Sequence, residues 1–186
     1  MRLFIGIEID GPVRDAVMNR VKPIKSRAIS WVPSENLHLT LRFLGSVPPE
    51  RVGAVKACLR KTVASASGFD LILNELGRFP AVIWIAAAKP DASESKELRA
   101  LALGIEAAIT GLGFPAESKP FVPHVTIGRI KERGHESIEI PNQPGWTSPA
   151  FQVRSIALFE SKTLPERAKY TVLERFSLPT EGEPCP

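Results

Sequence analysis

Short stretches of the chain alternate apolar and polar residues, or run apolar between turn residues, and both patterns predict β-strands. They are residues 2–9, 37–45, 69–78, 82–88, 122–130, 151–161 and 169–178. Three stretches with apolar residues at helical spacing predict helices. They are residues 10–24, 48–68 and 91–113, the last with a serine before its charged first turn. The order β-α-β-α-β-β-α-β-β-β indicates an α+β fold with largely antiparallel strands.

Two of the predicted strands carry the same local pattern, a histidine and a threonine two residues apart within an apolar run. The stretches read NLHLTLRFLG at residues 36–45 and PFVPHVTIGR at residues 120–129. Every second residue of a strand points to the same face. Alternation therefore places His38, Thr40 and Arg42 on one face of the first strand.

The opposite face of the first strand is apolar, and we expect it to pack into the core. Its members are Leu37, Leu39, Leu41 and Phe43. In the second strand the same alternation places His124 and Thr126 on one face with Gly128. It sends Arg129 to the other face.

Two imidazoles and two hydroxyls suit a site that acts on a phosphate. An imidazole, with an ordinary pKa of about 6.5, can remove or supply a proton near neutral pH. Threonine hydroxyls can donate hydrogen bonds to phosphoryl oxygens. A single His-x-Thr strand is more typical of an ordinary solvated sheet face, but its duplication favours a functional site. No Asp, Glu or Cys stands at ligand spacing around either histidine, so we expect no metal.

The two motifs stand with the opening RLFIGIEI, the stretch WVPSENLHLTL and the late LFESK…YTVLERFSL. Together they resemble the 2H phosphoesterase superfamily, and within it the RNA 2′,3′-cyclic phosphodiesterases, also called 2′-5′ RNA ligases. The resemblance spans about residues 2–178. It implies a bilobal α+β fold, with two pseudo-symmetric, mainly antiparallel sheets flanked by helices and the active-site cleft between them. We expect residues 1–178 to form this one domain and residues 179–186 a flexible tail.

The resemblance also implies a reaction, the hydrolysis of a terminal RNA 2′,3′-cyclic phosphate to a 2′-phosphomonoester, without a cofactor. By motif position it makes His38 the proton donor to the leaving 3′ oxygen and His124 the proton acceptor from water. Thr40 and Thr126 would hold the phosphate. Residue chemistry alone leaves the two histidine roles interchangeable, because the motifs are nearly alike.

Other residues are candidates for substrate contacts. On the face of His38, Arg42 is a candidate for phosphate or a neighbouring nucleotide. Arg129 is a candidate if its strand bulges or ends there. Trp31 and Tyr170 are candidates for stacking on a nucleobase. Phe43 is assigned to the core.

Two other functions stay open. One keeps the site but changes the substrate, as in a 2′-5′ RNA ligase or a phosphodiesterase acting on 2′,5′-linked oligonucleotides or another cyclic phosphate. The other is a protein that binds RNA ends without turnover. The chain also differs from the family at residues 161–170, SKTLPERAKY, which lack a glycine often found between the last two strands.

Composition and cysteine usage indicate the class of protein and its cellular compartment. Of 186 residues, 44% are hydrophobic and 24% charged, and the net charge of +4 permits an anionic partner without requiring one. No segment approaches the ~20 apolar residues of a membrane span. Cys58 and Cys185 stand in such different settings that they indicate neither a disulfide framework nor a zinc site. We therefore expect the protein to be cytoplasmic. We also expect it to be a monomer, and we expect His135 to lie on its surface.

Overall fold

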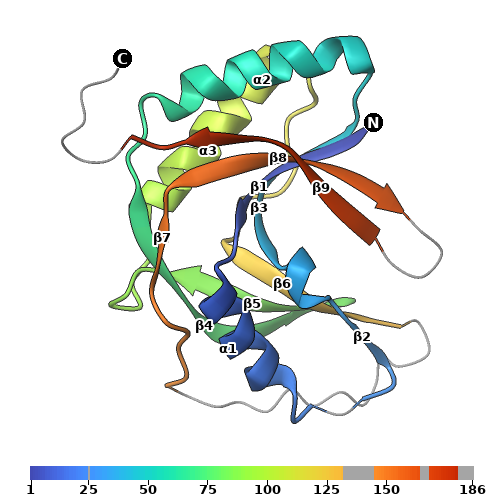
Figure 1. Cartoon of the computed structure of the whole chain (residues 1–186), viewed down its shortest axis with the longest axis vertical. Coiled ribbons are helices and arrows are strands. Elements are labelled where there is room, and N and C mark those ends of the chain that lie inside the picture. Colours follow the sequence, from blue (N-terminus) through green and yellow to red (C-terminus); the bar gives the residue numbers. More distant parts are fainter. Residues whose placement is uncertain (25, 132–144, 164–167, 180–186) are drawn as a thin grey trace.

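The computed structural model describes residues 1–24, 26–131, 145–163 and 168–179 (Figure 1). The helices are α1 (Gly11–Val21), α2 (Pro49–Val63) and α3 (Lys96–Gly111), with a 3₁₀ turn at Ser34–Asn36. The strands are β1 (Arg2–Glu8), β2 (Ile29–Trp31), β3 (His38–Ser46), β4 (Phe69–Phe79), β5 (Val82–Ala88), β6 (His124–Ile130), β7 (Phe151–Val153), β8 (Ser155–Thr163) and β9 (Ala168–Ser177). Each predicted element has a counterpart. The stretch predicted as one strand at 151–161 is divided between β7 and β8, and β2 was not predicted.

The strands form one curled sheet in the order β7-β4-β5-β6-β3-β1-β8-β9, with β2 paired to β6. Every pairing is antiparallel. The predicted α+β class is therefore confirmed. The two expected halves are continuous, because β3 pairs with β6 through Leu39 and Val125. Helices α2 and α3 lie together at one end of the molecule and α1 at the other (Figure 1).

The core follows from the apolar faces that the pattern predicted. On α1 the buried apolar residues recur every fourth position, at Val13, Val17 and Val21. Helix α3 begins at the predicted serine, where Ser95 Oγ accepts a hydrogen bond of 3.1 Å from the Leu98 backbone N–H. This cap satisfies one of the otherwise unpaired donors of the first turn. Burying each such aliphatic side chain contributes roughly 1.5–3 kcal/mol and holds the helices against the sheet.

A β-bulge interrupts the alternation of β3. The residues on either side of Leu41 pair with consecutive residues of β1, so Leu41 is the extra residue. Beyond it the faces exchange, leaving Arg42 only 6% exposed and Phe43 59% exposed. The expectations that Arg42 shares the face of His38, and that Phe43 lies in the core, are both wrong for this reason.

The second motif strand carries the same bulge. Thr126 and Gly128 pair with consecutive residues of β5, so Ile127 is the extra residue. Gly128 is then buried and Arg129 exposed, which gives β6 the same burial sequence as the start of β3. The expected sharing of a face by Gly128 and His124 is wrong, and so is the expectation that Arg129 points away from His124.

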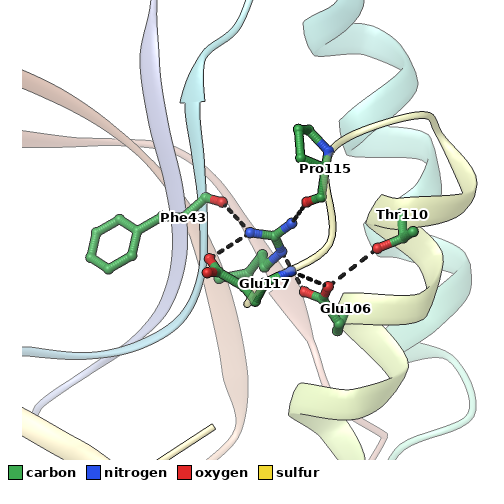
Figure 2. A network of polar contacts seen from close by, with 6 residues as sticks. Phe43, Glu106, Thr110, Pro115 and Glu117 are labelled. Atoms are coloured by element: carbon green, nitrogen blue, oxygen red, sulfur yellow. Dashed lines mark hydrogen bonds and ion pairs between the residues drawn. The ribbon is translucent and has the colours of Figure 1, made fainter. Parts of the chain in front are cut away.

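Arg42 occupies the core side of the first bulge, where it joins two carboxylates (Figure 2). Its Nη1 donates to Glu117 Oε1 at 2.5 Å and to the backbone oxygen of Phe43 at 2.8 Å. Its Nε forms an ion pair of 2.5 Å with Glu106 Oε2, not aligned as a hydrogen bond, and its Nη2 donates to Pro115 O. Since Glu106 lies on α3, the network ties the bulge of β3 to that helix.

Some predictions fall on residues 132–144, 164–167 or 180–186, which lie outside the described residues. They concern His135, Cys185, most of the 179–186 tail and part of the 161–170 segment. Just before the tail, Leu178 is buried and its N–H donates to Arg154 O at 2.8 Å. No helix within the described ranges is long and apolar enough to cross a membrane. The monomeric state and the cytoplasmic location stay predictions.

Removal of the Arg42 guanidinium should destabilise the fold, because it takes away a buried side chain, an ion pair with the partly buried Glu106, and the donor to the Phe43 and Pro115 backbone oxygens. We expect Arg42→Ala to lower the free energy of unfolding by about 2–3 kcal/mol. Arg60→Ala is the control, since Arg60 pairs with Glu174 on the surface and its loss should cost at most about 1 kcal/mol. Urea titration of both variants measures the difference. Equal losses would contradict a structural role for the Arg42 network.

Candidate active site

The two histidines of the motifs lie close together on adjacent strands. Leu39 and Val125, which directly follow them, are Cα partners in the antiparallel pairing of β3 with β6. Residues flanking such a pair on the other face of a sheet are cross-strand neighbours. The structure therefore brings four predicted residues into one cluster. They are His38, Thr40, His124 and Thr126.

Both imidazoles are oriented by the same backbone contact. His38 Nδ1 lies 2.7 Å from Asn36 O, and His124 Nδ1 lies 2.7 Å from Val122 O. A carbonyl oxygen only accepts, so Nδ1 must carry the proton in each ring. Proton transfer to or from a substrate therefore falls to Nε2 of both histidines.

Aromatic rings surround His38. The centroid of its imidazole lies 4.7 Å from Phe4, 5.9 Å from Phe159 and 5.1 Å from Tyr170, the last edge-on. Phe4 and Phe159 stack on each other at 4.7 Å. These rings keep water from one side of the imidazole, so His38 lies in a less polar setting than an exposed histidine.

Burial lowers the pKa of His38 below its ordinary value. The hydrogen bond to the Asn36 carbonyl opposes this change, because it favours the charged ring. The positive charges of Arg129 and His124 lower the pKa further. Their influence also indicates that both groups lie near His38, as the strand register requires.

His124 lies against two other rings. Phe79 meets it edge-on, with centroids 5.5 Å apart, and Trp84 at 6.1 Å. Each histidine therefore has its own aromatic neighbours, from β1, β8 and β9 on one side and from β4 and β5 on the other. Sequence analysis did not anticipate the Phe79 and Trp84 contacts, since no local pattern links that hairpin to β6.

The structure places some of the other candidate substrate-contact residues near the histidines and others on the core side of the sheet. Arg129 is exposed on the face of His124, and Tyr170 contacts His38. Arg42 is buried on the far side of β3 and does not reach this face. Trp31 packs on the core side of β6, where a Cβ on Gly128 would lie 3.1 Å from its ring. This position gives no support to Trp31 as a stacking residue, and its contact with a nucleobase stays a prediction.

A cavity of about 210 Å³ opens beside His38, lined in part by Glu8, Asn36 and Tyr170. A larger one, of about 580 Å³, lies between residues 7–10 and 150–155 and is lined by neither motif histidine. Within the described part of the chain, no three His, Cys, Asp or Glu residues are grouped so that they could hold a metal ion.

The lowered pKa of His38 can be measured directly. Burial disfavours the imidazolium, so a lower pH is needed to protonate the ring. In the free protein His38 should therefore titrate below the ordinary value of about 6.5. A ¹H–¹³C NMR titration, with the resonance assigned through His38→Gln, gives the midpoint. A midpoint at or above the ordinary value would contradict the buried, positively surrounded setting.

The lowered pKa of His38 also makes the stability of the fold depend on pH. Unfolding exposes the ring and restores its ordinary pKa, so the unfolded chain binds the proton first as the pH falls. The contribution of His38 to stability is present above about pH 6.5 and is lost as the pH falls through the folded-state value.

Comparison with known proteins gives one family and several relatives that share one name. Residues 13–163 match the family described as the 2′-5′ RNA ligase superfamily. The RNA 2′,3′-cyclic phosphodiesterase of Archaeoglobus fulgidus is 30% identical over 185 residues, covering 95% of this chain and 99% of that protein. The protein of the same name from Thermus thermophilus is 32% identical over 193 residues, covering 96% and 90%.

Solved structures agree with this assignment. Escherichia coli LigT complexed with 3′-AMP has a TM-score of 0.81 at 27% identity, covering 95% of this chain and 97% of that one. The Thermus thermophilus protein TT0787 has a TM-score of 0.78 at 30% identity, covering 97% and 100%. The chain belongs to the 2′-5′ RNA ligase superfamily, the 2H phosphoesterases, and within it to the family of RNA 2′,3′-cyclic phosphodiesterases.

Proposed function

We propose that the protein hydrolyses the 2′,3′-cyclic phosphate at the end of an RNA to a 2′-phosphomonoester, using two histidines and no metal. The observation that carries this proposal is the matched pair of imidazoles. Both have Nδ1 fixed by a backbone carbonyl, and both lie on one face of adjoining strands. The names of the relatives supply the substrate class.

Binding of the phosphate falls to the polar groups around the two rings. The hydroxyls of Thr40 and Thr126 donate hydrogen bonds to the non-bridging oxygens, whose charge grows in the transition state. Arg129, exposed on the same face, adds a positive charge near the phosphate. The aromatic neighbours of each histidine limit the access of water to the reacting atoms.

In the chemical step, a water oxygen attacks phosphorus while Nε2 of His124 takes a proton from that water. The bond between phosphorus and O3′ breaks, and Nε2–H of His38 gives its proton to O3′. The products are a 2′-phosphomonoester and a free 3′ hydroxyl. His124 is then charged and His38 neutral, and exchange of protons with solvent restores the starting forms.

The donor role requires a protonated His38, whereas burial lowers the pKa of this ring in the free protein. A bound cyclic phosphate carries a negative charge, which favours the imidazolium and counteracts the effects of Arg129 and His124. The family resemblance supports His38 as the donor. The lowered pKa alone would equally suit a neutral His38 that acts as the base.

The reaction can be tested on a short RNA that ends in a 2′,3′-cyclic phosphate, with excess EDTA present. We expect wild type to form the 2′-phosphate. His38→Ala and His124→Ala should each be slower by about 10²–10⁴-fold, since each removes one proton transfer. His135→Ala is the matched control, as His135 is the remaining histidine of the chain, and it should keep full activity.

Other outcomes distinguish the alternatives. An intact cyclic phosphate, together with cleavage or formation of a 2′,5′ linkage, would indicate the related activity on 2′,5′-linked oligonucleotides. Tight binding of the RNA end with no turnover of any of these substrates would indicate a binding protein. Activity that EDTA abolishes would refute the metal-independent mechanism.

A further inference from the structure

Asn36 makes two hydrogen bonds that connect His38 with the last strand of the sheet. Its backbone oxygen lies 2.7 Å from His38 Nδ1, and its side-chain Nδ2 donates to Ala168 O at 2.9 Å. Ala168 lies 132 residues further along the chain. The residue that fixes how the His38 ring is turned is therefore itself held by a strand distant in sequence.

The other end of this connection returns to the same ring. Ala168 is the first residue of β9, which lies at the end of the strand order and pairs with β8 (Figure 1). Tyr170 lies two residues further along β9, and its ring meets the His38 imidazole edge-on with centroids 5.1 Å apart. His38 is thus held between the carbonyl of Asn36 and the ring of Tyr170, and the Asn36 amide keeps these two groups together.

The segment before His124 is held differently. Pro123 O accepts a hydrogen bond of 3.2 Å from the Ala87 backbone N–H, which joins this segment to β5. A side chain therefore anchors the turn beside His38, whereas the backbone anchors the segment beside His124. A substitution at Asn36 should loosen one imidazole and leave the other in place.

On the basis of the proposed function, we propose that Asn36 is the positioning residue of the acid. Its side-chain amide holds the turn at Ser34–Asn36 against β9 and so keeps Nε2–H of His38 directed at the leaving O3′. It acts through its own carbonyl, which accepts from Nδ1–H both while the ring is charged and after the ring has given its proton away. An imidazole released from this carbonyl can turn, and a displacement of about 1 Å at the reacting atoms can cost about 10²-fold in rate.

Removal of the amide should slow the step that needs the acid. We expect Asn36→Ala to hydrolyse an RNA 2′,3′-cyclic phosphate with a kcat roughly 10- to 100-fold below that of wild type. On the cyclic substrate with sulfur in place of O3′ it should react at nearly the wild-type rate, because a thiolate leaves without a proton. Asn19→Ala is the control, since Asn19 is exposed on α1 and its loss should slow neither reaction.

The state of the ring can be measured without any substrate. In a neutral imidazole the ¹⁵N shifts distinguish a proton on Nδ1 from one on Nε2. The ring of His38 should carry its proton on Nδ1 in wild type, because the Asn36 carbonyl accepts from that atom. Asn36→Ala should increase the share of the Nε2–H tautomer at His38 and leave His124 as in wild type.

A second variant and the stability of the fold separate positioning from a merely structural role. Asn36→Leu, which has a side chain of similar shape without a donor, should match Asn36→Ala on both substrates. Equal slowing on the two substrates, no slowing on either, an unchanged His38 tautomer, or loss of the fold in urea titration would overturn the positioning role. If wild type leaves both cyclic substrates intact, the proposed reaction fails, and the tautomer then decides whether Asn36 positions the ring.

Discussion

The pairing of Leu39 with Val125 joins the two halves of the sheet, and the candidate site depends on it. Its backbone contact brings together two motifs that lie far apart in the sequence. The buried side chains of the pair also hold the opposite face rigid, so the imidazoles on that face have little freedom to separate. The carbonyls of Asn36 and Val122 then fix how each ring is turned. A catalytic pair needs both of these constraints, because proton transfer depends on hydrogen-bond distances at one phosphate.

The two halves share a geometry but not an environment. Both motif strands bulge at the fourth position and expose the second residue after the bulged one, which is Phe43 in one strand and Arg129 in the other. His38 is enclosed by aromatic rings and its pKa is lowered, which separates its behaviour from that of a solvent-exposed histidine. Differences of this kind let two similar imidazoles take opposite roles in one reaction. The two motif strands therefore have similar backbone geometry, whereas the side chains around each histidine differ.

Sequence pattern was sufficient for the three helices, for most of the strands and for the pairing of His with Thr on one face, because strand periodicity and helix caps are local. It missed the short strand β2 and did not separate β7 from β8. It failed beyond the bulges, since alternation assumes a regular pleat. The apolar spacing gave no warning, because Leu39, Leu41 and Phe43 stand two apart in the sequence, whereas the structure buries Leu44 and exposes Phe43. The burial of Arg42 could not be inferred locally, because its partners Glu106 and Glu117 are distant in the chain.

The central claim is that one histidine acts as the acid and the other as the base on a single phosphate. A cyclic substrate with sulfur in place of O3′ tests it most directly, because a thiolate leaves without protonation far more readily than an alkoxide. The rate of His38→Ala should recover toward that of wild type on this substrate, while His124→Ala stays slow. Recovery of His124→Ala alone would exchange the two roles. Recovery of both variants, or of neither, would contradict a division of acid and base between them.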